Sequence, residues 1–398
     1  MLIRWPRGIH SYFFYGVILL IMIGLFLGFH NLLLRYKIKG IKKTFFIYNT
    51  DYFLKKEQQK APNIKIINNG DKGIWDRMKK RDKLTLVPEL VIGEEEGDSL
   101  KTFYRIGSVI ADEDGNIYVC EVDDGHIKKF NKNGDYLLTI SRKGSSPGEL
   151  YLPGLLRFDN NKNLCVLEFG NQRISTFSCM GTYLGSLKLE FRKGAAGFVI
   201  DELGLIYIST FDSQTEKIIH KYNQTGDKLV SFGDPVYFPK STNAIDKIIQ
   251  ANISIGPLLL FGNELYFSIH NPYEIRKYTR DGQLIMKIFR KNEFMLPPKI
   301  FLIDKKTIQF KVPAMSTFLG KWNDKIINVI EIPDYLNLKV LCVIDIFDLD
   351  GQLLTSIYLT DNVRIYYIDS NSRLYGCLID QNGVEKVVRF QIKSTNNR

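Results

Sequence analysis

From residue 100 onward, the 398-residue chain repeats a single pattern. Each copy opens with a polar turn and an alternating strand, and the first halves begin at Asp112, Asp159, Asp201, Phe261 and Asp369. The second half of the pattern, found five times, is a strand that ends in an aromatic residue, a glycine turn and another strand. The aromatic residues are Phe130, Phe177, Tyr222, Tyr278 and Phe347, and the turn glycines are Gly134, Gly181, Gly226, Gly282 and Gly351. The chain is therefore built from units of similar structure.

The chemistry of each copy predicts short antiparallel strands. Glycine adopts the positive φ that tight hairpin turns require, and neighbouring Asn and Asp tolerate it. Alternating β-branched and aromatic residues suit a sheet that is buried between neighbours. A four-stranded unit of this kind cannot bury both faces alone, so the units must stack. The spacings of 47, 45, 56 and 69 residues between the turn glycines suit the blades of a β-propeller with growing insertions.

The two ends of the repeated region predict how the ring closes. Five units have a complete glycine hairpin, while a sixth, at Asp369, ends in the strand KVVRFQIK without a partner of its own. The stretch from Leu84 to Gly93 is an isolated strand ahead of the first unit. We predict that it forms the outer strand of the last blade, because ring closure removes exposed sheet edges. The fold class is then all-β, a six-bladed β-propeller over residues 84–393 with a tail at 394–398.

Motifs of the first blade resemble those of NHL-repeat six-bladed propellers, in particular bacterial versions that are tethered near the N-terminus. The matching motifs are DEDGNIYV, IKKF, NGD and the segment KGSSPGEL from Lys143 to Leu150. The resemblance extends over residues 84–393 and implies a binding platform or scaffold, or in some members an enzyme. Members with an N-terminal hydrophobic segment usually expose the propeller outside the cytoplasm, so the resemblance implies an extracytoplasmic domain.

A hydrophobic run precedes the repeats. Residues 12–34 contain no Asp, Glu, Lys or Arg, and as a helix they are about 34 Å long, enough to cross a hydrocarbon core of roughly 30 Å. A cleaved signal peptide is the alternative, but its apolar region of about 7 to 15 residues ends at a small-residue site, whereas this run ends at Leu34 and Arg35. We predict a single transmembrane helix that remains as an anchor, after a short tail at residues 1–11.

The formal net charge of +11 is concentrated beside this hydrophobic run. Residues 35–84 carry 15 Lys and Arg against 5 Asp and Glu, and the chain beyond them is close to neutral. A nucleic-acid-binding domain needs positive charge on its binding surface, so nucleic acid is excluded as a partner. Residues 35–83 are predicted to form a basic stalk, either attracted to anionic lipid headgroups or simply solvated. The positive-inside rule favours a cytoplasmic propeller, but we favour the extracytoplasmic side that the resemblance implies.

Strand alternation places the turns of every blade on two opposite faces. The tight first-to-second and third-to-fourth turns lie on one, the turn face. The second-to-third loops and the connections between blades lie on the other, the loop face, and the connections are long at residues 141–153, 233–252 and 291–313. Function tends to lie on such loops, so the candidate binding residues are Asp123, Asp124, His126, Asn171, Arg173, Asp212, His270 and Asn271. Each also has a structural interpretation, because Asp and Asn form turns and a polar residue often begins a strand.

No catalytic residue, metal site or cofactor is predicted. A catalytic zinc needs about three convergent ligands, and of five histidines His10 and His30 lie at the hydrophobic run. The innermost strands are mostly apolar, with Arg105 and Arg157 as candidates to line the axial channel, and no nucleophile elbow, P-loop or dinucleotide motif occurs. The five cysteines show no CxxC spacing and are expected to be buried apolar residues without disulfides.

Three functions are compatible with these observations. The first is a membrane-anchored, non-catalytic binding or scaffold propeller that presents its loop face to a protein, peptide or glycan. The alternative is a propeller hydrolase or lyase with a site at the mouth of the axial channel. The third is a purely structural subunit of a membrane assembly, joined through the helix and the aromatic residues of the stalk.

Overall fold

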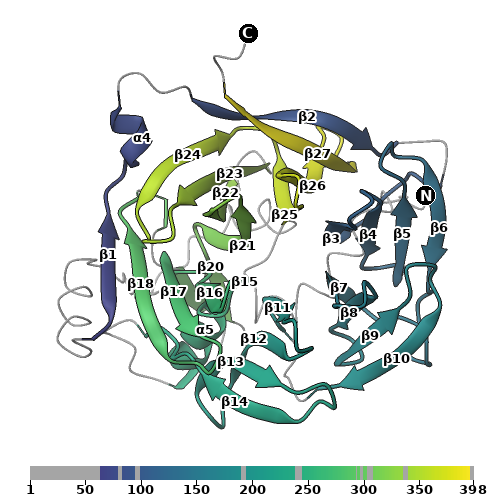
Figure 1. The fold of residues 1–398 in the computed structure, drawn as a ribbon, viewed down its shortest axis with the longest axis horizontal. Helices are drawn as coiled ribbons and strands as arrows, with labels where there is room; N and C mark the ends of the chain where they lie inside the picture. Colours follow the sequence, from purple (N-terminus) through teal and green to yellow (C-terminus); the bar gives the residue numbers. More distant parts are fainter. Residues whose placement is uncertain are drawn as a thin grey trace.

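The computed structural model describes residues 63–78, 83–94, 99–189, 194–237, 244–292, 294–295, 299–302, 308–334 and 339–394. Six sheets, each built on four antiparallel strands, stand in a ring around a central axis (Figure 1). The all-β, six-bladed propeller is therefore confirmed. The predicted transmembrane segment, residues 12–34, lies outside the described residues, and within them no helix has the length and hydropathy to span a bilayer.

The blades follow one another along the chain, each from its innermost to its outermost strand. Blade one comprises β3 (Ile106–Ala111), β4 (Ile117–Glu121), β5 (His126–Phe130) and β6 (Tyr136–Ile140). Blade two comprises β7 (Pro153–Phe158), β8 (Leu164–Glu168), β9 (Arg173–Phe177) and β10 (Tyr183–Lys188). Blade three comprises β11 (Gly197–Ile200), β12 (Ile206–Asp212), β13 (Lys217–Tyr222) and β14 (Lys228–Phe232).

The second half of the ring has the same construction. Blade four comprises β15 (Leu258–Phe261), β16 (Glu264–Ser268), β17 (Glu274–Thr279) and β18 (Leu284–Arg290). Blade five comprises β21 (Met315–Trp322), β22 (Lys325–Asp334), β23 (Lys339–Phe347) and β24 (Leu353–Leu359). Blade six comprises β25 (Val363–Ile368), β26 (Arg373–Ile379), β27 (Glu385–Ser394) and, from the other end of the domain, β2 (Leu84–Ile92).

Asp side chains shape the first turn of several blades. Asp112, Asp201 and Asp369 each accept the backbone N–H of the fourth residue after them, at 2.8 to 2.9 Å. Each also lies within hydrogen-bonding distance of the hydroxyl of the tyrosine six residues on, which is Tyr118, Tyr207 or Tyr375. The five turn glycines of the repeat have φ between 84° and 90°, as their predicted role requires. The sequence repeat is thus a repeat of turn chemistry.

The aromatic residue that precedes each glycine turn packs between neighbouring blades. These five side chains are at most 2% exposed: Phe130, Phe177, Tyr222, Tyr278 and Phe347. Edge-to-face pairs such as Phe177–Tyr183, with ring centroids 5.7 Å apart, add directional packing to the apolar burial. The contacts between neighbouring blades therefore contain clusters of buried apolar side chains.

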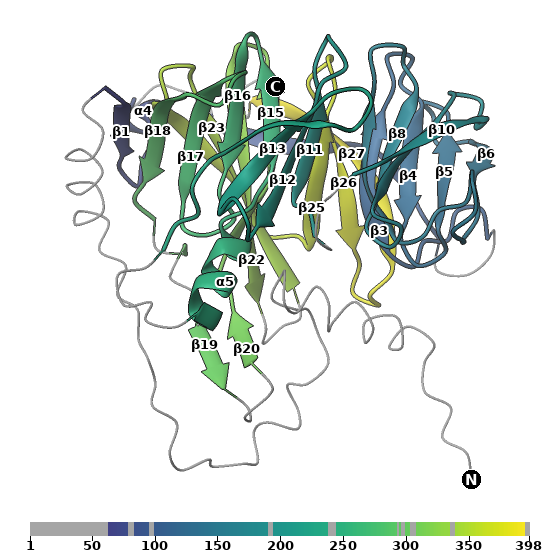
Figure 2. The ribbon, with the colours of Figure 1, turned by 90° about the horizontal axis from the view of Figure 1, so that it is seen from below.

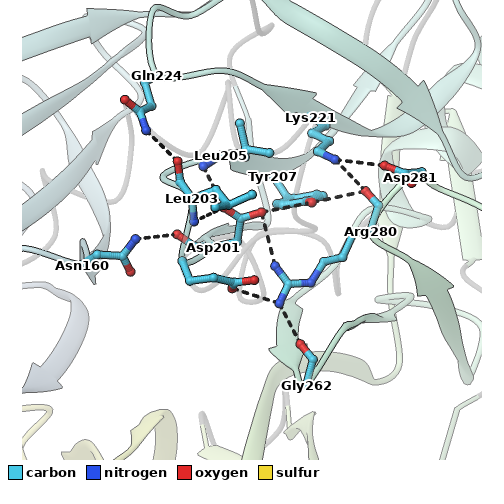
Figure 3. Close-up of polar contacts among 11 residues, drawn as sticks. Asn160, Asp201, Leu203, Leu205, Tyr207, Lys221, Gln224, Gly262, Arg280 and Asp281 are labelled. Carbon is cyan, nitrogen blue, oxygen red and sulfur yellow. Dashed lines mark hydrogen bonds and ion pairs between the residues drawn. The ribbon is translucent and has the colours of Figure 1, made fainter.

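Polar contacts also join blades, as in the network around Asp201 on the turn face (Figure 3). Arg280, in the β17–β18 turn of blade four, pairs with the Asp201 carboxylate at 3.2 Å. Tyr207 and Lys221 donate to the backbone carbonyl of Arg280 at 3.2 and 3.0 Å. Asn160 of blade two donates to the Asp201 carbonyl at 2.9 Å. One turn of blade three is thereby tied to both of its neighbours.

Closure of the ring follows the prediction. β2 pairs antiparallel with β27, from Leu84 opposite Ser394 to Ile92 opposite Val387, and it is the outermost strand of blade six. On the loop face, Glu385 at the start of β27 accepts the N–H of Ile106 at 2.5 Å. The two ends of the domain therefore complete one sheet and also join it to blade one.

The prediction that residues 35–83 form a stalk outside the propeller needs correction where that region is described. β1 (Lys65–Asn69) pairs in parallel with β18 and gives blade four a fifth strand (Figure 1). The buried Asn69 donates to the carbonyls of Phe289 and Gly351 and accepts the N–H of Leu353, so it links blades four and five. The short helix α4 (Ile74–Arg77) then packs on blade five, where Asp76 accepts the hydroxyl of Thr355.

Two insertions project from the loop face (Figure 2). The helix α5 (Ala244–Ile253) lies between β14 and β15. The antiparallel pair β19 (Lys299–Leu302) and β20 (Ile308–Lys311) lies in the connection that leads to blade five. Both insertions lie in connections between blades. The described turns on the opposite, turn face are short.

Ile92→Asp tests the closing ladder. Ile92 is 3% exposed and packs in the core between blades six and one, so an unpaired carboxylate there should lower the free energy of unfolding by about 3 kcal/mol or more. Denaturant unfolding of the full chain measures the change.

The matched control is Val91→Asp on the same strand. Val91 is 50% exposed, so this change should cost less than about 0.5 kcal/mol. Equal stability of the two variants would show that β2 does not seal the ring.

Candidate functional site

On the loop face, the β4–β5 loop of blade one brings together three predicted residues. Asp123 pairs with Arg105 at 2.8 Å, so this predicted channel residue lies just ahead of β3 and faces the same loop. Asp124 is exposed and His126 half-buried, and each has one potential donor atom within 4.8 Å of Glu121 at the end of β4. Burial raises the pKa of Glu121 to about 7. Burial, followed by the Lys128 charge, lowers the pKa of His126.

In blade two, Asn171 and Arg173 have a structural role. Glu168, fully buried at the end of β8, accepts hydrogen bonds from Asn171 Nδ2 at 2.6 Å, Arg173 Nε at 2.7 Å and Ser175 Oγ at 2.5 Å. Arg173 also donates to the carbonyl of Glu149 in the connection from blade one. These side chains stabilise a buried carboxylate and fix a loop, which favours the structural interpretation of both residues.

Asp212 lies at the end of β12 and organises its own loop. It accepts the N–H of Gln214 at 2.8 Å and pairs with Lys228 at 3.3 Å. Burial acts to raise the pKa of Asp212, but the Gln214 N–H and the Lys228 ammonium together hold it below its ordinary value. The structure therefore favours the turn-forming interpretation of this residue.

His270 and Asn271 are buried in the β16–β17 loop and are not brought to the surface. Their backbone N–H groups donate to Ile255 and Ile253, and Asn271 Nδ2 donates to the carbonyl of Ala314. Burial lowers the pKa of His270 to about 4. Both residues hold the loop against the connections on either side of blade four.

Around the axial mouth, blades five, six and one contribute a charged cluster that the sequence analysis missed. Arg364 on β25 lies 3.8 Å from Glu331 on β22, and Tyr366 donates to the carbonyl of Ile106 at 3.1 Å. Burial raises the pKa of both Glu331 and Glu385. The sequence feature that could have indicated this cluster is the presence of charged residues near the ends of strands that are otherwise mostly apolar.

Arg157, the second predicted channel residue, lies apart from this cluster. It is half-buried near the end of β7, where its guanidinium lies 5.6 Å from the centroid of the Phe198 ring and donates to the Leu156 carbonyl. Burial lowers its pKa to about 10. Arg105 thus precedes the innermost strand of blade one, whereas Arg157 lies near the far end of the innermost strand of blade two.

Four of the five cysteines are buried, as predicted, and none forms a disulfide. Burial raises the pKa of Cys165 to about 12 and that of Cys120 further still, so both stay protonated thiols at neutral pH. Cys179, in the β9–β10 turn, is exposed.

The buried imidazole of His270 predicts a loss of stability in mild acid. The unfolded chain takes up a proton near the ordinary pKa of 6.5, whereas the folded chain does so near 4. His270 therefore contributes no penalty above pH 7 and lowers the free energy of unfolding by about 3 kcal/mol as the pH falls to 4. Denaturant unfolding of His270→Gln, compared with the unaltered chain at both pH values, should show a smaller acid-induced loss. An unchanged pH dependence would contradict this origin.

Comparison with known proteins agrees with this architecture. A comparison with curated proteins found no match. The fold is similar to that of a putative exported protein from Bacteroides fragilis, with TM-score 0.54, 11% identity, and coverage of 83% of this chain and 100% of that chain. It is also similar to a member of the DUF4221 family from Bacteroides vulgatus, with TM-score 0.52, 12% identity, and coverage of 79% and 100%. Similarity at this level of identity establishes the fold alone.

The family comparison is more direct. The sequence model of the DUF5128 family, whose description is 6-bladed beta-propeller, matches residues 102–309. This match spans just over half of the chain and runs from the approach to blade one as far as β20. The chain therefore belongs to the DUF5128 family of six-bladed β-propellers.

Proposed function

We propose that this protein is a membrane-anchored, non-catalytic binding or scaffold propeller that presents its loop face to a protein, peptide or glycan partner. The proposal has two parts. The first concerns the surface that binds, and the second concerns the tether and the side of the membrane.

The observation that carries the first part is a pair of exposed tyrosines at equivalent positions of adjacent blades. Tyr104 and Tyr151 each stand two residues before an innermost strand, and their side chains are 67% and 38% exposed. Their backbone N–H groups are fixed by Glu121 and Glu168, at 3.2 and 2.9 Å. Exposed aromatic side chains on a rigid backbone are typical anchors of binding surfaces, because they bury a large area with little loss of conformational entropy.

Other features of the loop face support the same interpretation. Two large apolar side chains on this face are also exposed. Leu100, ahead of β3, is 38% exposed, and Ile248, on α5, is 48% exposed. The α5 and β19–β20 insertions project here and enlarge the face. Most of the polar candidates in blades two to four hold loops in place, which suits a preformed binding surface.

Site-specific photocrosslinking in native membranes tests the binding surface. Replacement of Tyr104 or Tyr151 by p-benzoylphenylalanine should yield a discrete crosslinked species. In a chain that carries the crosslinker at Tyr104, Tyr151→Ala should reduce its yield by roughly tenfold, as expected for a hot-spot residue.

The matched controls lie on the turn face, where Met180 and Leu203 are 71% and 67% exposed. The same crosslinker at these positions should give no such species. Equal crosslinking from the two faces, or from neither, would contradict the proposal.

The tether is proposed from the apolar run at residues 12–34, which bears no charge, and from the basic residues that follow it. We place the propeller on the extracytoplasmic side because NHL-like propellers with such a segment are usually exposed there. The opposing argument is the positive-inside rule, so the side of the membrane needs a direct measurement.

Cys179 offers that measurement. It is the one exposed cysteine of the five in the chain, in the β9–β10 turn. A membrane-impermeant maleimide should label the full-length protein in intact cells, and Cys179→Ser should abolish the label. Labelling that appears only after the membrane is permeabilised would place the propeller in the cytoplasm.

The second candidate function, a hydrolase or lyase with a site at the axial mouth, is favoured by one observation. Glu331 and Glu385 are buried carboxylates with raised pKa values beside Arg364, an arrangement that suits general acid–base chemistry. Loss of crosslinking from the tyrosine positions in Glu385→Gln would favour a ligand that enters the mouth.

A further inference from the structure

The β4–β5 loop of blade one and the β8–β9 loop of blade two follow strand pairs with the same register. Different side chains occupy the equivalent positions of the two loops. Glu121 lies opposite His126 across β4 and β5, as Glu168 lies opposite Arg173 across β8 and β9. Asp124 and Asn171 each stand three residues after the glutamate. The two loops can therefore be compared position by position within one molecule.

In blade two, the protein itself supplies the positive charge that the buried glutamate needs. Arg173 donates to Glu168 at 2.7 Å, with Asn171 and Ser175 completing its hydrogen bonds. A buried carboxylate requires partners of this kind, because an unpaired buried charge is costly.

In blade one, no arginine lies opposite the glutamate. Glu121 is 1% exposed, and among the described residues its Oε1 and His126 Nε2 are buried atoms without a hydrogen-bond partner. The arginine is replaced by His126 and the amide by Asp124, while Lys128 donates to the carbonyls of Ser99 and Thr102. Blade one thus has no arginine at the position of Arg173, and the nearby Lys128 charge only opposes the burial that raises the pKa of Glu121.

The three side chains are also close enough to share one ligand. Glu121, Asp124 and His126 each offer one donor atom, and all three atoms lie within 4.8 Å of one another. Glu121 is buried, His126 half-buried and Asp124 exposed, so the group opens to solvent on the side of Asp124. Further charges lie nearby: the acids Asp123 and Glu385, and the cations Arg105 and Lys128.

We propose that Glu121, Asp124 and His126 bind one divalent transition-metal ion of the Zn²⁺ or Mn²⁺ type. Two carboxylates and an imidazole form a donor set that suits these ions, whereas Ca²⁺ and Mg²⁺ prefer oxygen ligands alone. Neutral imidazole is the commonest metal ligand in proteins, and His126 Nε2 is a buried atom without a hydrogen-bond partner among the described residues. The ion takes the place that Arg173 occupies in blade two. This inference goes beyond the proposed partner surface and does not depend on it.

Zn²⁺ titration of the full-length protein, purified in detergent without a histidine tag, tests the site by calorimetry. The unaltered chain should bind one Zn²⁺ that Glu121→Gln and His126→Arg each weaken at least roughly tenfold. Zn²⁺ should also raise the melting temperature of the unaltered chain, but not of the two variants, because binding stabilises only a folded site.

His126→Arg is the sharper of the two variants because it copies the Glu–Arg pair of blade two. It should remain folded, with a melting temperature in the absence of metal no lower than that of the unaltered chain, while losing the Zn²⁺ response. Asp212→Asn, which removes a loop-face carboxylate in blade three, is the control and should leave Zn²⁺ binding unchanged. No Zn²⁺ binding by the unaltered chain, or equal binding by both site variants, would overturn the proposal.

Discussion

The antiparallel ladder between β2 and β27 is the contact on which the rest of the ring depends. It joins residues 84–92 to residues 387–394, so it can form only after the whole domain has been made. It removes the free edge of blade six, and Glu385 extends the seal to Ile106 at the entry to blade one. The charged cluster at the axial mouth comes from blades five, six and one. Its geometry therefore exists only in the closed ring.

Within that ring, several blades contain a buried carboxylate, and different side chains stabilise it in each. The carboxylate of Asp345 is satisfied by Arg290 of the neighbouring blade, with Tyr273 and Ser356 as further donors. Glu274 pairs with Arg276 and Lys287 within blade four. In each case a cationic side chain of the protein accompanies the buried acid. Glu121 stands out because it lies opposite an imidazole, and its Oε1 has no hydrogen-bond partner among the described residues.

The fold could be predicted because its signals are local. Positive φ at Gly134 and its counterparts, and Asp turns such as that of Asp112, are encoded within a few residues. Closure was predictable from an unpaired strand at each end of the domain. The addition of β1 was not, because parallel pairing between residues more than 200 positions apart has no local signal.

The candidate site was harder to predict for a related reason. A polar residue in a loop has the same sequence signature whether it meets a ligand or a buried partner. Arg173 and His126 occupy equivalent positions, and only the contacts of Glu168 and Glu121 distinguish them. Alignment of the segments ExxNxR and ExxDxH would have drawn attention to Glu121. The axial cluster has no such signal, since Glu331, Arg364 and Glu385 are far apart in the chain.

The position of β1 has a mechanical consequence. Any tension applied to the chain ahead of Lys65 first meets the hydrogen bonds between β1 and β18, and then the Asn69 contacts to blades four and five. The docked α4 follows before the chain reaches β2. Tension from the N-terminal side is thus resisted by contacts to blades four and five before it reaches the β2–β27 ladder that closes the ring.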